Sequence, residues 1–270
     1  MSHETRVSIV GGGVMANAFV QSLLAKGVVP ESNIIVSSRG KQALEAIRER
    51  HGVRTTVSNR EAVQFGDIVI LAVKPQNLER VFADINGAMQ PDQVLLSIVA
   101  GAGIDRLREG TGHDRIVRCM PNTPAQVGAG VSVWMGSPVL TEEDRVLVRS
   151  VLGAVGIEIQ VDEERYVDMA TAVSGTGPAY VFLFVEAFMD AAVHLGFQRD
   201  VALNLVLQTM EGSIKLARSS NKHVAELKNS VTSPGGTTAE ALYELEKGGF
   251  RTALSKAVWA AYQRTLVLRG

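Results

Sequence analysis

Hydroxyl side chains gather around a flexible bend in residues 229–250, NSVTSPGGTTAEALYELEKGGF, directly before a helical pattern. The bend is Pro234-Gly235-Gly236, and the hydroxyls belong to Ser230, Thr232, Ser233, Thr237 and Thr238. The first amides of a helix lack intrahelical partners and carry partial positive charge. Glycine leaves room for a ligand to touch this backbone, and the hydroxyls of Ser233, Thr237 and Thr238 can donate to a carboxylate or accept from an N–H. The stretch predicts a site for a small substrate that bears both groups; the alternative is that Thr237 or Thr238 only caps its own helix.

A glycine-rich turn in residues 7–24, VSIVGGGVMANAFVQSLL, indicates a second site. Gly11, Gly13 and the small Ala16 stand between an apolar strand pattern and a helical one. Glycines permit the sharp turn and let backbone amides approach a pyrophosphate, whose charge the helix N-terminus favours. The motif follows the first strand and opens a helix, as dinucleotide binding requires, so we interpret it as a nucleotide site rather than an ordinary glycine turn.

The end of the second predicted strand indicates which dinucleotide binds. An NAD site usually has a carboxylate there for the ribose hydroxyls, whereas this chain has Ser37, Ser38 and Arg39. Hydroxyls and a guanidinium suit a 2′-phosphate, and no carboxylate is present to repel it. We therefore predict NADPH as the cofactor, with NADH possible; the alternative is that Arg39 is a solvated residue that begins the next helix.

Two further strand ends carry polar residues toward the same crevice. Lys74 in ILAVKPQ is placed to face a phosphate or ribose, because ligands of open parallel sheets bind beyond the carboxyl ends of strands. In RCMPNTPAQVGAG, Pro121 and Pro124 stiffen the backbone around Asn122, so that its side chain is aimed with little loss of entropy. For Lys74 and Asn122 the alternatives are surface charge and turn capping.

The second half opens with another small-residue helix start, SGTGPAYVFLFVEAF, where Pro178 suits a first helical turn. Glu186 and Asp190 lie four residues apart, hence on one helical face, and apolar residues occupy the rest of the circumference. Such a helix is buried from several sides, either against a second subunit or as a central core helix. The apolar run VFLFVEAFMDAAV is expected to be too short to span a bilayer.

The predicted secondary structure that must position these residues changes about midway along the chain, from alternating strands and helices to helices alone. RVSIV, NIIVS, DIVILAV, QVLLSIV and DRIVRCM are β-type runs that alternate with helical stretches such as QALEAIRERH and NLERVFADIN. From about residues 158–165 onward only helical periods appear. We predict an α/β fold with an N-terminal Rossmann-type parallel sheet domain, residues 1–161, followed by an all-α substrate and dimerisation domain, residues 162–270.

Composition excludes several classes of function. The 270-residue chain has a formal net charge of -1, from 27 Lys and Arg against 28 Asp and Glu, so it lacks the basic surplus of a nucleic-acid-binding protein. A single cysteine, Cys119, fits a reducing compartment, and five scattered histidines with no second cysteine indicate no metal site. Residues 1–10 lack a secretory signal pattern, so we expect a cytoplasmic protein that acts on a small molecule, away from membranes.

At this point the segments together carry a family resemblance. GGGVMA, AVKPQ, MPNTPA, SGTGPAYVFLFVEAFMDAAVHLG and VTSPGGTTAEALYELEKGGFRTAL resemble, in order and spacing, the signatures of the pyrroline-5-carboxylate reductases over nearly the whole chain. The resemblance implies reduction of Δ1-pyrroline-5-carboxylate to L-proline by NAD(P)H, the last step of proline biosynthesis. It also implies a homodimer with interlocked helical domains that assembles into a decamer.

The resemblance extends to individual residues. It implies that Glu164 is a further substrate contact beside Ser233, Gly236, Thr237 and Thr238, and that position 230, often Asn in the family and here Ser230, is a departure. Thr238 is expected to accept a hydrogen bond from the ring N–H, while its backbone and Ser233 bind the carboxylate. Along the cofactor the resemblance places Val14, Met15, Ala16, Ser37, Asn59, Ala72, Val73, Lys74, Pro75 and Ala100.

Four other functions can be weighed against this one. A reductase of a related cyclic imine, such as the six-membered homologue, differs only in ring size, and an NADPH-binding protein without catalysis needs no substrate loop. A 3-hydroxyacid dehydrogenase needs a catalytic lysine on the long interdomain helix, but after Gly177 the next lysine is Lys215. No G-x-S-x-G elbow of a serine hydrolase occurs. The preferred hypothesis requires the helix starts at Gly13 and Thr238 to face one another.

Overall fold

The computed structural model describes residues 5–269, and the chain divides into two compact units. The first extends to Pro178 and also includes the chain from Ala261 onward. The second comprises Ala179–Ala260. Each unit is described by itself below.

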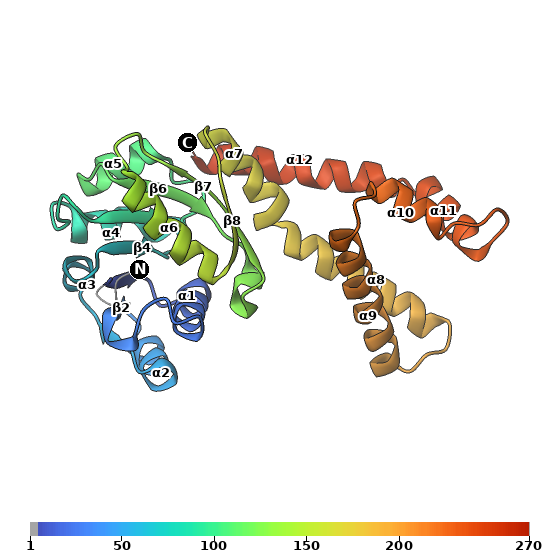
Figure 1. Ribbon diagram of the computed structural model, residues 1–270, viewed down its shortest axis with the longest axis horizontal. Coiled ribbons are helices and arrows are strands. Elements are labelled where there is room, and N and C mark those ends of the chain that lie inside the picture. The colour runs from blue at the N-terminus through green and yellow to red at the C-terminus, as the bar shows by residue number, and fades with distance from the viewer. Residues whose placement is uncertain (1–4, 270) are drawn as a thin grey trace. The chain divides into compact units, whose positions relative to one another are not determined.

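An eight-stranded sheet in the order β3-β2-β1-β4-β5-β6-β7-β8 forms the centre of the first unit (Figure 1). Every neighbouring pair is parallel except β6 and β7. The strands are β1 (Val7–Val10), β2 (Ile34–Ser37), β3 (Arg54–Thr56), β4 (Ile68–Leu71), β5 (Val94–Ser97), β6 (Ile116–Met120), β7 (Gly130–Gly136) and β8 (Gly156–Gln160). The predicted α/β class and all five predicted strands are confirmed.

Three strands escaped the sequence analysis for identifiable reasons. β3 has only three residues, none of them a large apolar one, and lies at one edge of the sheet. β7 and β8 each begin with a glycine, and β8 carries the polar side chains Glu158 and Gln160 at the opposite edge. The edge strands β3 and β8 need no continuous apolar run, because one side of each is not covered by a neighbour. β7 lies inside the sheet, and its apolar run is short because Ser132 interrupts it and glycines bound it.

Helices and short turns connect the strands and fill the second unit. In the first unit they are α1 (Val14–Ala25), η1 (Glu31–Asn33), α2 (Lys41–His51), α3 (Asn59–Phe65), η2 (Pro75–Asn77), α4 (Leu78–Ile85), α5 (Ile104–Thr111), η3 (Thr123–Val127), α6 (Glu142–Ala154), α7 (Glu164–Ala170) and η4 (Thr171–Gly175). The later helices are α8 (Gly177–His194), α9 (Arg199–Ser219), α10 (Val224–Ser230), α11 (Thr237–Lys247) and α12 (Phe250–Arg269).

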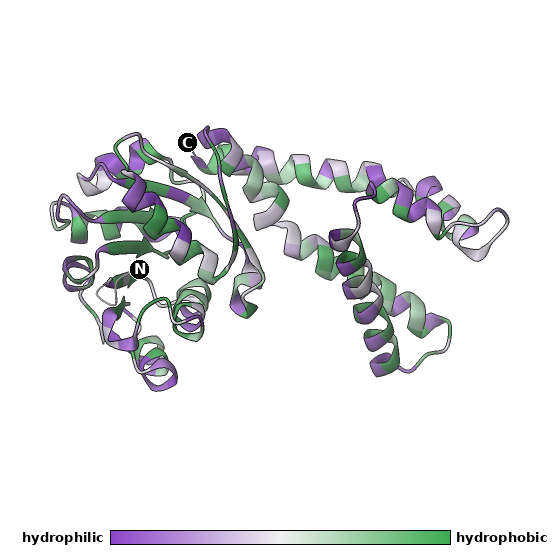
Figure 2. Ribbon diagram, viewed as in Figure 1, coloured by the Kyte–Doolittle hydropathy of each residue, from purple (hydrophilic) through white to green (hydrophobic). Residues whose placement is uncertain are grey.

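Alternate residues of the buried strands enter two separate cores, one on each face of the sheet. In β4, Ile68 and Ile70 pack with residues of α1 and α6, whereas Val69 and Leu71 pack with residues of α3, α4 and α5. The strands appear as a hydrophobic layer in Figure 2. Each fully buried Leu or Ile contributes about 1.5–3 kcal/mol, so the sheet is a rigid platform for whatever its strand ends carry.

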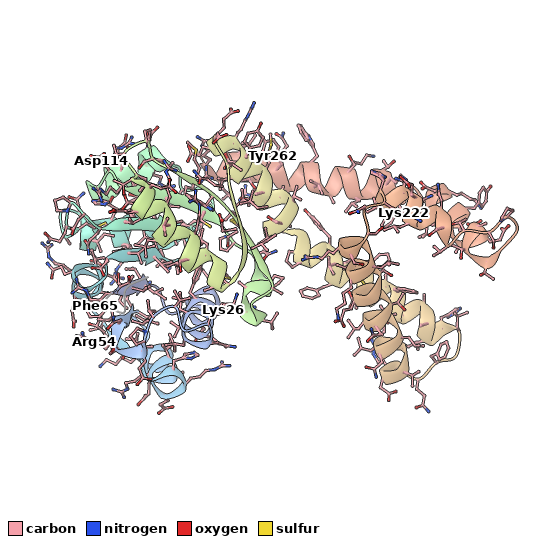
Figure 3. The ribbon with its side chains drawn as sticks, viewed as in Figure 1. Lys26, Arg54, Phe65, Asp114, Lys222 and Tyr262 are labelled. Atoms are coloured by element: carbon pink, nitrogen blue, oxygen red, sulfur yellow. The ribbon has the colours of Figure 1, made fainter. Side chains whose placement is uncertain are left out.

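Two polar contacts at the rim hold helices and edge strands in place. Lys26, at the end of α1, donates to the carbonyl of Gly153 in α6 at 2.9 Å. The guanidinium of Arg54 in β3 lies 4.6 Å from the ring centre of Phe65 in α3; Figure 3 labels all three side chains. The first contact joins the C-terminal end of α1 to α6, in addition to the apolar packing between these helices.

A buried ion network ties α7 and the end of α12 to the sheet. Arg118 of β6 pairs with the fully buried Asp168 and lies 3.0 Å from Glu164, both in α7. Arg269 of α12 pairs with the same two acids at 2.8 Å and 2.9 Å. The secondary structure changes from strand to helix between Gln160 and Glu164. The first compact unit nevertheless continues past this change to Pro178 and so includes α7. The predicted division at residues 161 and 162 stays a prediction.

The second unit exposes many apolar side chains. α8 contains no buried residue, and its Phe182 and Leu183 are each 66% exposed. The helical run from Glu164 to His194 spans 31 residues and contains an 18-residue window with a mean hydropathy of 1.3, so by length and composition alone it could cross a membrane. The length argument against a membrane span was therefore wrong, because α7, η4 and α8 continue one another.

Candidate cofactor and substrate sites

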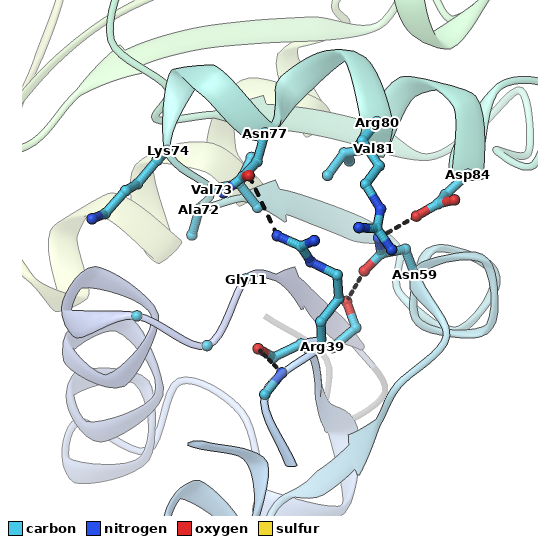
Figure 4. Close-up of a pocket in the computed structure, with 15 residues that line it drawn as sticks. Gly11, Arg39, Asn59, Ala72, Val73, Lys74, Asn77, Arg80, Val81 and Asp84 are labelled. Atoms are coloured by element: carbon cyan, nitrogen blue, oxygen red, sulfur yellow. Dashed lines mark hydrogen bonds between the residues drawn. The ribbon is translucent and has the colours of Figure 1, made fainter. Parts of the chain in front are cut away.

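A groove of about 480 Å³ opens in the first unit at the carboxyl ends of β1, β2 and β4 (Figure 4). These ends meet at one edge because the strands are parallel. Of the residues predicted to bind the cofactor, those that line the groove are Gly11, Gly13, Ser37, Ser38, Arg39, Asn59, Ala72, Val73 and Lys74. Segments separated by some sixty residues in the sequence thus converge as the glycine fingerprint predicted.

Glycines 11 and 13 serve the turn in different ways. Gly11 has a φ of 118°, and a Cβ there would collide with the carbonyl of Ala72, so only glycine fits. Its amide donates to Ser37 at 2.8 Å, which joins the ends of β1 and β2. A Cβ on Gly13, by contrast, would meet nothing within 4 Å. Gly13 begins α1 without any side-chain cap, so the open space beside it borders the first amides of the helix.

Hydrogen bonds hold the polar residues beyond β2 in fixed orientations (Figure 4). The buried Ser37 hydroxyl donates to Asn59 at 2.9 Å, and the Asn59 amide donates to Asp84 at 2.9 Å. Arg39 donates to the side chain of Asn77 at 3.3 Å. Arg39 therefore lies along the groove just before α2, with its side chain exposed, and its contact with a cofactor stays a prediction.

Positive charge dominates the groove. Arg39, Lys74 and Arg80 line it against one acid, Asp84. Within residues 5–269, Lys74 and Arg80 have no hydrogen bond or ion pair, so their charges are available to a ligand. A concave surface with this excess attracts an anion.

Four groove residues on η2 and α4 were not predicted. They are Asn77 and, three, four and seven residues after it, Arg80, Val81 and Asp84, a spacing that places the four on one helical face. That spacing, downstream of a strand end already assigned to the crevice, was a signal available in the sequence. Gly12 and Gly40 complete the unpredicted lining.

The other predicted cofactor residues lie outside the lining. Ala16 is fully buried and Met15 packs against the core, so their backbone amides, together with that of the exposed Val14, are what they can offer a ligand. Asn122 accepts a hydrogen bond from the Val131 amide at 2.9 Å, which is the turn-capping role considered as the alternative. Pro75 begins η2 and Ala100 follows β5, and neither lines the groove.

In the second unit, the loop before α11 leaves three hydroxyls without partners. Ser230 and Thr232 donate to carbonyls of α10 at 2.7 Å each. Within the described part of the chain, Ser233, Thr237 and Thr238 make no side-chain hydrogen bond, and α11 begins after Gly236 with no side-chain cap. The capping alternative for Thr237 and Thr238 therefore does not apply.

The glycines of this loop bring backbone and hydroxyl close together. Gly235 has a φ of 67°, which favours glycine. A Cβ on Gly236 would collide with the Ser233 hydroxyl, so glycine lets that hydroxyl lie over the start of the helix. Free hydroxyls beside uncapped amides can hold a carboxylate and accept from an N–H.

Glu164, the predicted further substrate contact, is engaged within the first unit. One carboxylate oxygen accepts from the Ile104 amide at 2.8 Å and lies 3.0 Å from Arg118. The other accepts from Arg269 at 2.9 Å. The structure thus gives Glu164 the role of capping α5 within the ion network, and its contact with a substrate stays a prediction.

Known proteins resemble the chain over its whole length. Residues 164–268 match the family described as "Pyrroline-5-carboxylate reductase dimerisation", and residues 6–101 match "NADP oxidoreductase coenzyme F420-dependent". A pyrroline-5-carboxylate reductase from Arabidopsis thaliana is 38% identical over 260 residues, which cover 96% of this chain and 94% of that protein. The chain belongs to the pyrroline-5-carboxylate reductase family.

Solved structures agree with this assignment. The crystal structure of the Plasmodium falciparum pyrroline carboxylate reductase with NADP bound has a TM-score of 0.91 and 32% identity, over 99% of both chains. The Coxiella burnetii pyrroline-5-carboxylate reductase has a TM-score of 0.90 and 34% identity, over 98% of this chain and 99% of the other. The family assignment confirms the predicted fold and the predicted class of enzyme, an NAD(P)H-dependent oxidoreductase.

The match to a dimerisation domain explains the apolar second unit. It covers the helical run of Glu164–His194 and the exposed Phe182 and Leu183 of α8. The chain therefore forms homo-oligomers through this region. Burial against a second subunit, the first of the two readings of α8, accounts for its apolar surface without a membrane.

Proposed function

We propose that this protein reduces Δ1-pyrroline-5-carboxylate to L-proline, with NADPH as the preferred cofactor and NADH as a weaker one. The observation that carries the proposal is the set of free hydroxyls and uncapped amides at Ser233, Thr237 and Thr238, in a chain of the pyrroline-5-carboxylate reductase family. Such a set suits a small ring that carries both a carboxylate and an N–H.

The residues of the groove fit a phosphorylated dinucleotide. Gly11 and Gly13 let its pyrophosphate approach the start of α1, which favours the negative charge. Ser38 and Arg39 stand where an NAD enzyme has a carboxylate, so they suit the 2′-phosphate. When bound, the cofactor supplies a hydride to the ring carbon of the substrate's C=N bond.

The substrate loop binds and orients the imine. The amide of Thr238 and the hydroxyl of Ser233 hold the carboxylate, and the hydroxyl of Thr238 accepts a hydrogen bond from the ring N–H. When the imine enters protonated, its nitrogen receives the electron pair of the C=N bond and no general acid is required for that step. Holding the ring in a reactive orientation can remove several kcal/mol from the barrier. Thr237 and Gly236 keep the loop open to the ring.

Reduction requires the groove at Gly13 and the loop at Thr238 to meet in the working enzyme, which stays a prediction. We propose a homodimer that assembles into a decamer; the exposed apolar side chains of α8 support a large interface between subunits. We also propose a cytoplasmic location, which the free, buried Cys119 supports because a reducing compartment keeps thiols unpaired.

A cofactor-oxidation assay tests this function. Purified protein is mixed with NADPH or NADH and with pyrroline-5-carboxylate or its six-membered homologue, and NADPH or NADH absorbance is followed over time. We expect rapid oxidation of NADPH with the five-membered imine and a lower kcat/KM with NADH. Binding of NADPH without oxidation by either imine would instead indicate a non-catalytic binding protein. A higher kcat/KM with the six-membered imine would indicate the related imine reductase.

A further inference from the structure

Arg80 is a cation of the groove for which the fold provides no partner. It lies on α4, lines the groove, and makes no hydrogen bond or ion pair within residues 5–269. Neighbouring charges are used differently: Glu79 pairs with Arg106 at 2.7 Å, and Asp84 accepts from Asn59. Because Arg80 pairs with neither of these acids, its five donors are available to an anion.

Hydrogen bonds locate Arg80 at the β2 end of the groove. On the same helical face, Asn77 three residues earlier accepts from Arg39, and Asp84 four residues later accepts from Asn59. Both of those partners line the groove: Arg39 directly follows β2, and Asn59 begins α3 and accepts from Ser37 at the end of β2. In Figure 4 the Arg80 guanidinium lies between Arg39 and Asp84. Arg80 and Arg39 therefore approach the same end of the groove from opposite walls.

That end of the groove is where the two cofactors differ. The pyrophosphate is served by the glycine turn and the start of α1, whereas the residues after β2 face the adenosine ribose. At this position NADPH carries a doubly charged phosphate and NADH a hydroxyl. One arginine can donate to two phosphate oxygens side by side, and a second guanidinium on the facing wall can reach the third oxygen as well.

We propose that Arg80 binds the 2′-phosphate of NADPH together with Arg39 and is a specificity-determining residue for the phosphorylated cofactor. This inference rests on the proposed function for its cofactor, but it does not depend on which imine is reduced. It assigns Arg80 no contact with the adenine or the pyrophosphate. Arg80 therefore acts on NADPH and leaves NADH unaffected.

The first test measures binding without catalysis. Calorimetry compares adenosine 2′,5′-bisphosphate, which carries the extra phosphate, with 5′-AMP, which lacks it. A charge-assisted hydrogen bond at a partly exposed site corresponds to a change of about tenfold in affinity. We expect Arg80→Met to lose about tenfold in affinity for the bisphosphate, with 5′-AMP unchanged, and Arg80→Lys to recover part of the loss.

The control variant is Arg60→Met, which removes the same charge from an exposed position on α3 that does not line the groove. It should leave both affinities unchanged. If Arg60→Met lowers the affinity for the bisphosphate as much as Arg80→Met does, the effect comes from the net charge of the protein and the proposal fails. Equal losses of affinity for the bisphosphate and for 5′-AMP in Arg80→Met would also overturn the proposal, because Arg80 would then contact a part that the two ligands share.

Steady-state kinetics give the second test. In Arg80→Met, the KM for NADPH should rise about tenfold while kcat and the KM for NADH stay unchanged. Added salt should reduce the difference in KM for NADPH between the wild type and Arg80→Met, since salt screens exposed charges. An unchanged KM for NADPH would contradict the inference. Absence of imine reduction in the wild type would instead refute the proposed function, while the binding experiment would still decide the role of Arg80.

Discussion

Replacing Gly13 by alanine should separate cofactor binding from stability. Gly13 has φ −85° and ψ −169°, which alanine adopts freely, and its added methyl would meet nothing within 4 Å. Alanine restricts the unfolded chain, which favours folding by about 0.4–1 kcal/mol, and it is a poorer N-cap than glycine by a similar amount. The two effects nearly cancel, so the change in unfolding free energy is expected to be close to zero.

The same methyl occupies the space where the pyrophosphate must approach α1. Losing close contact between the amides and the phosphates removes charge-assisted hydrogen bonds, each of which contributes about 1.5–3 kcal/mol. The KM for NADPH, and equally for NADH, should therefore rise by about tenfold or more. Thermal unfolding and steady-state kinetics on one preparation measure both quantities.

Two other glycines serve as comparisons for this experiment. Gly11→Ala should fail to fold stably, because its φ of 118° and the collision with Ala72 affect the chain itself. Gly153→Ala, inside α6 and free of neighbours within 4 Å, should raise stability by about 1 kcal/mol without any change in KM. The reasoning is refuted if Gly13→Ala keeps the wild-type KM for both cofactors, or if its loss of activity follows a loss of stability.

Three further predictions follow from the contacts above. Thr238→Ala should lower kcat/KM for the imine about 10- to 100-fold without moving the pH optimum, because the Thr238 hydroxyl orients the ring rather than titrating. Thr232→Ala is the kinetic control: the Thr232 hydroxyl donates to a carbonyl of α10, so its loss should leave kcat/KM near the wild-type value. Asp168→Asn should lower the free energy of unfolding in urea by about 3–5 kcal/mol, because it leaves Arg118 buried without its main charged partner. Glu163→Gln, at an exposed ion pair, should lower it by less than about 1 kcal/mol, and equal losses of stability in the two variants would contradict a buried network. Burial, and secondarily the charge of Arg50, lowers the pKa of His51 below its usual 6.5 in the folded protein. The unfolded chain therefore binds more protons, and the free energy of unfolding falls as the pH drops below 6.5. His51→Gln should make the free energy of unfolding less dependent on pH in this range, and an unchanged pH dependence would show that His51 is not its cause.

Much of the fold and of the cofactor site follows from local patterns. β1, β2, β4, β5 and β6 are continuous apolar runs, and such runs predict buried parallel strands in any protein. The glycine fingerprint is equally local, because the turn at Gly11 and the start of α1 involve adjacent residues. β3 and β8 were missed because an edge strand is stabilised by its neighbour in the sheet rather than by its own composition, and β7, inside the sheet, because Ser132 and two flanking glycines interrupt its apolar run.

The sequence by itself determined that glycines, hydroxyls and arginines stand at helix starts and strand ends, since these are properties of neighbouring residues. Only the tertiary structure decided which of them remain available. The Asn122 side chain accepts from the Val131 amide and Glu164 belongs to the ion network, whereas Arg80 and Thr238 have no such partner among residues 5–269. A polar side chain binds a ligand only when the fold leaves it unsatisfied, and its competing partners come from distant segments that packing alone brings together.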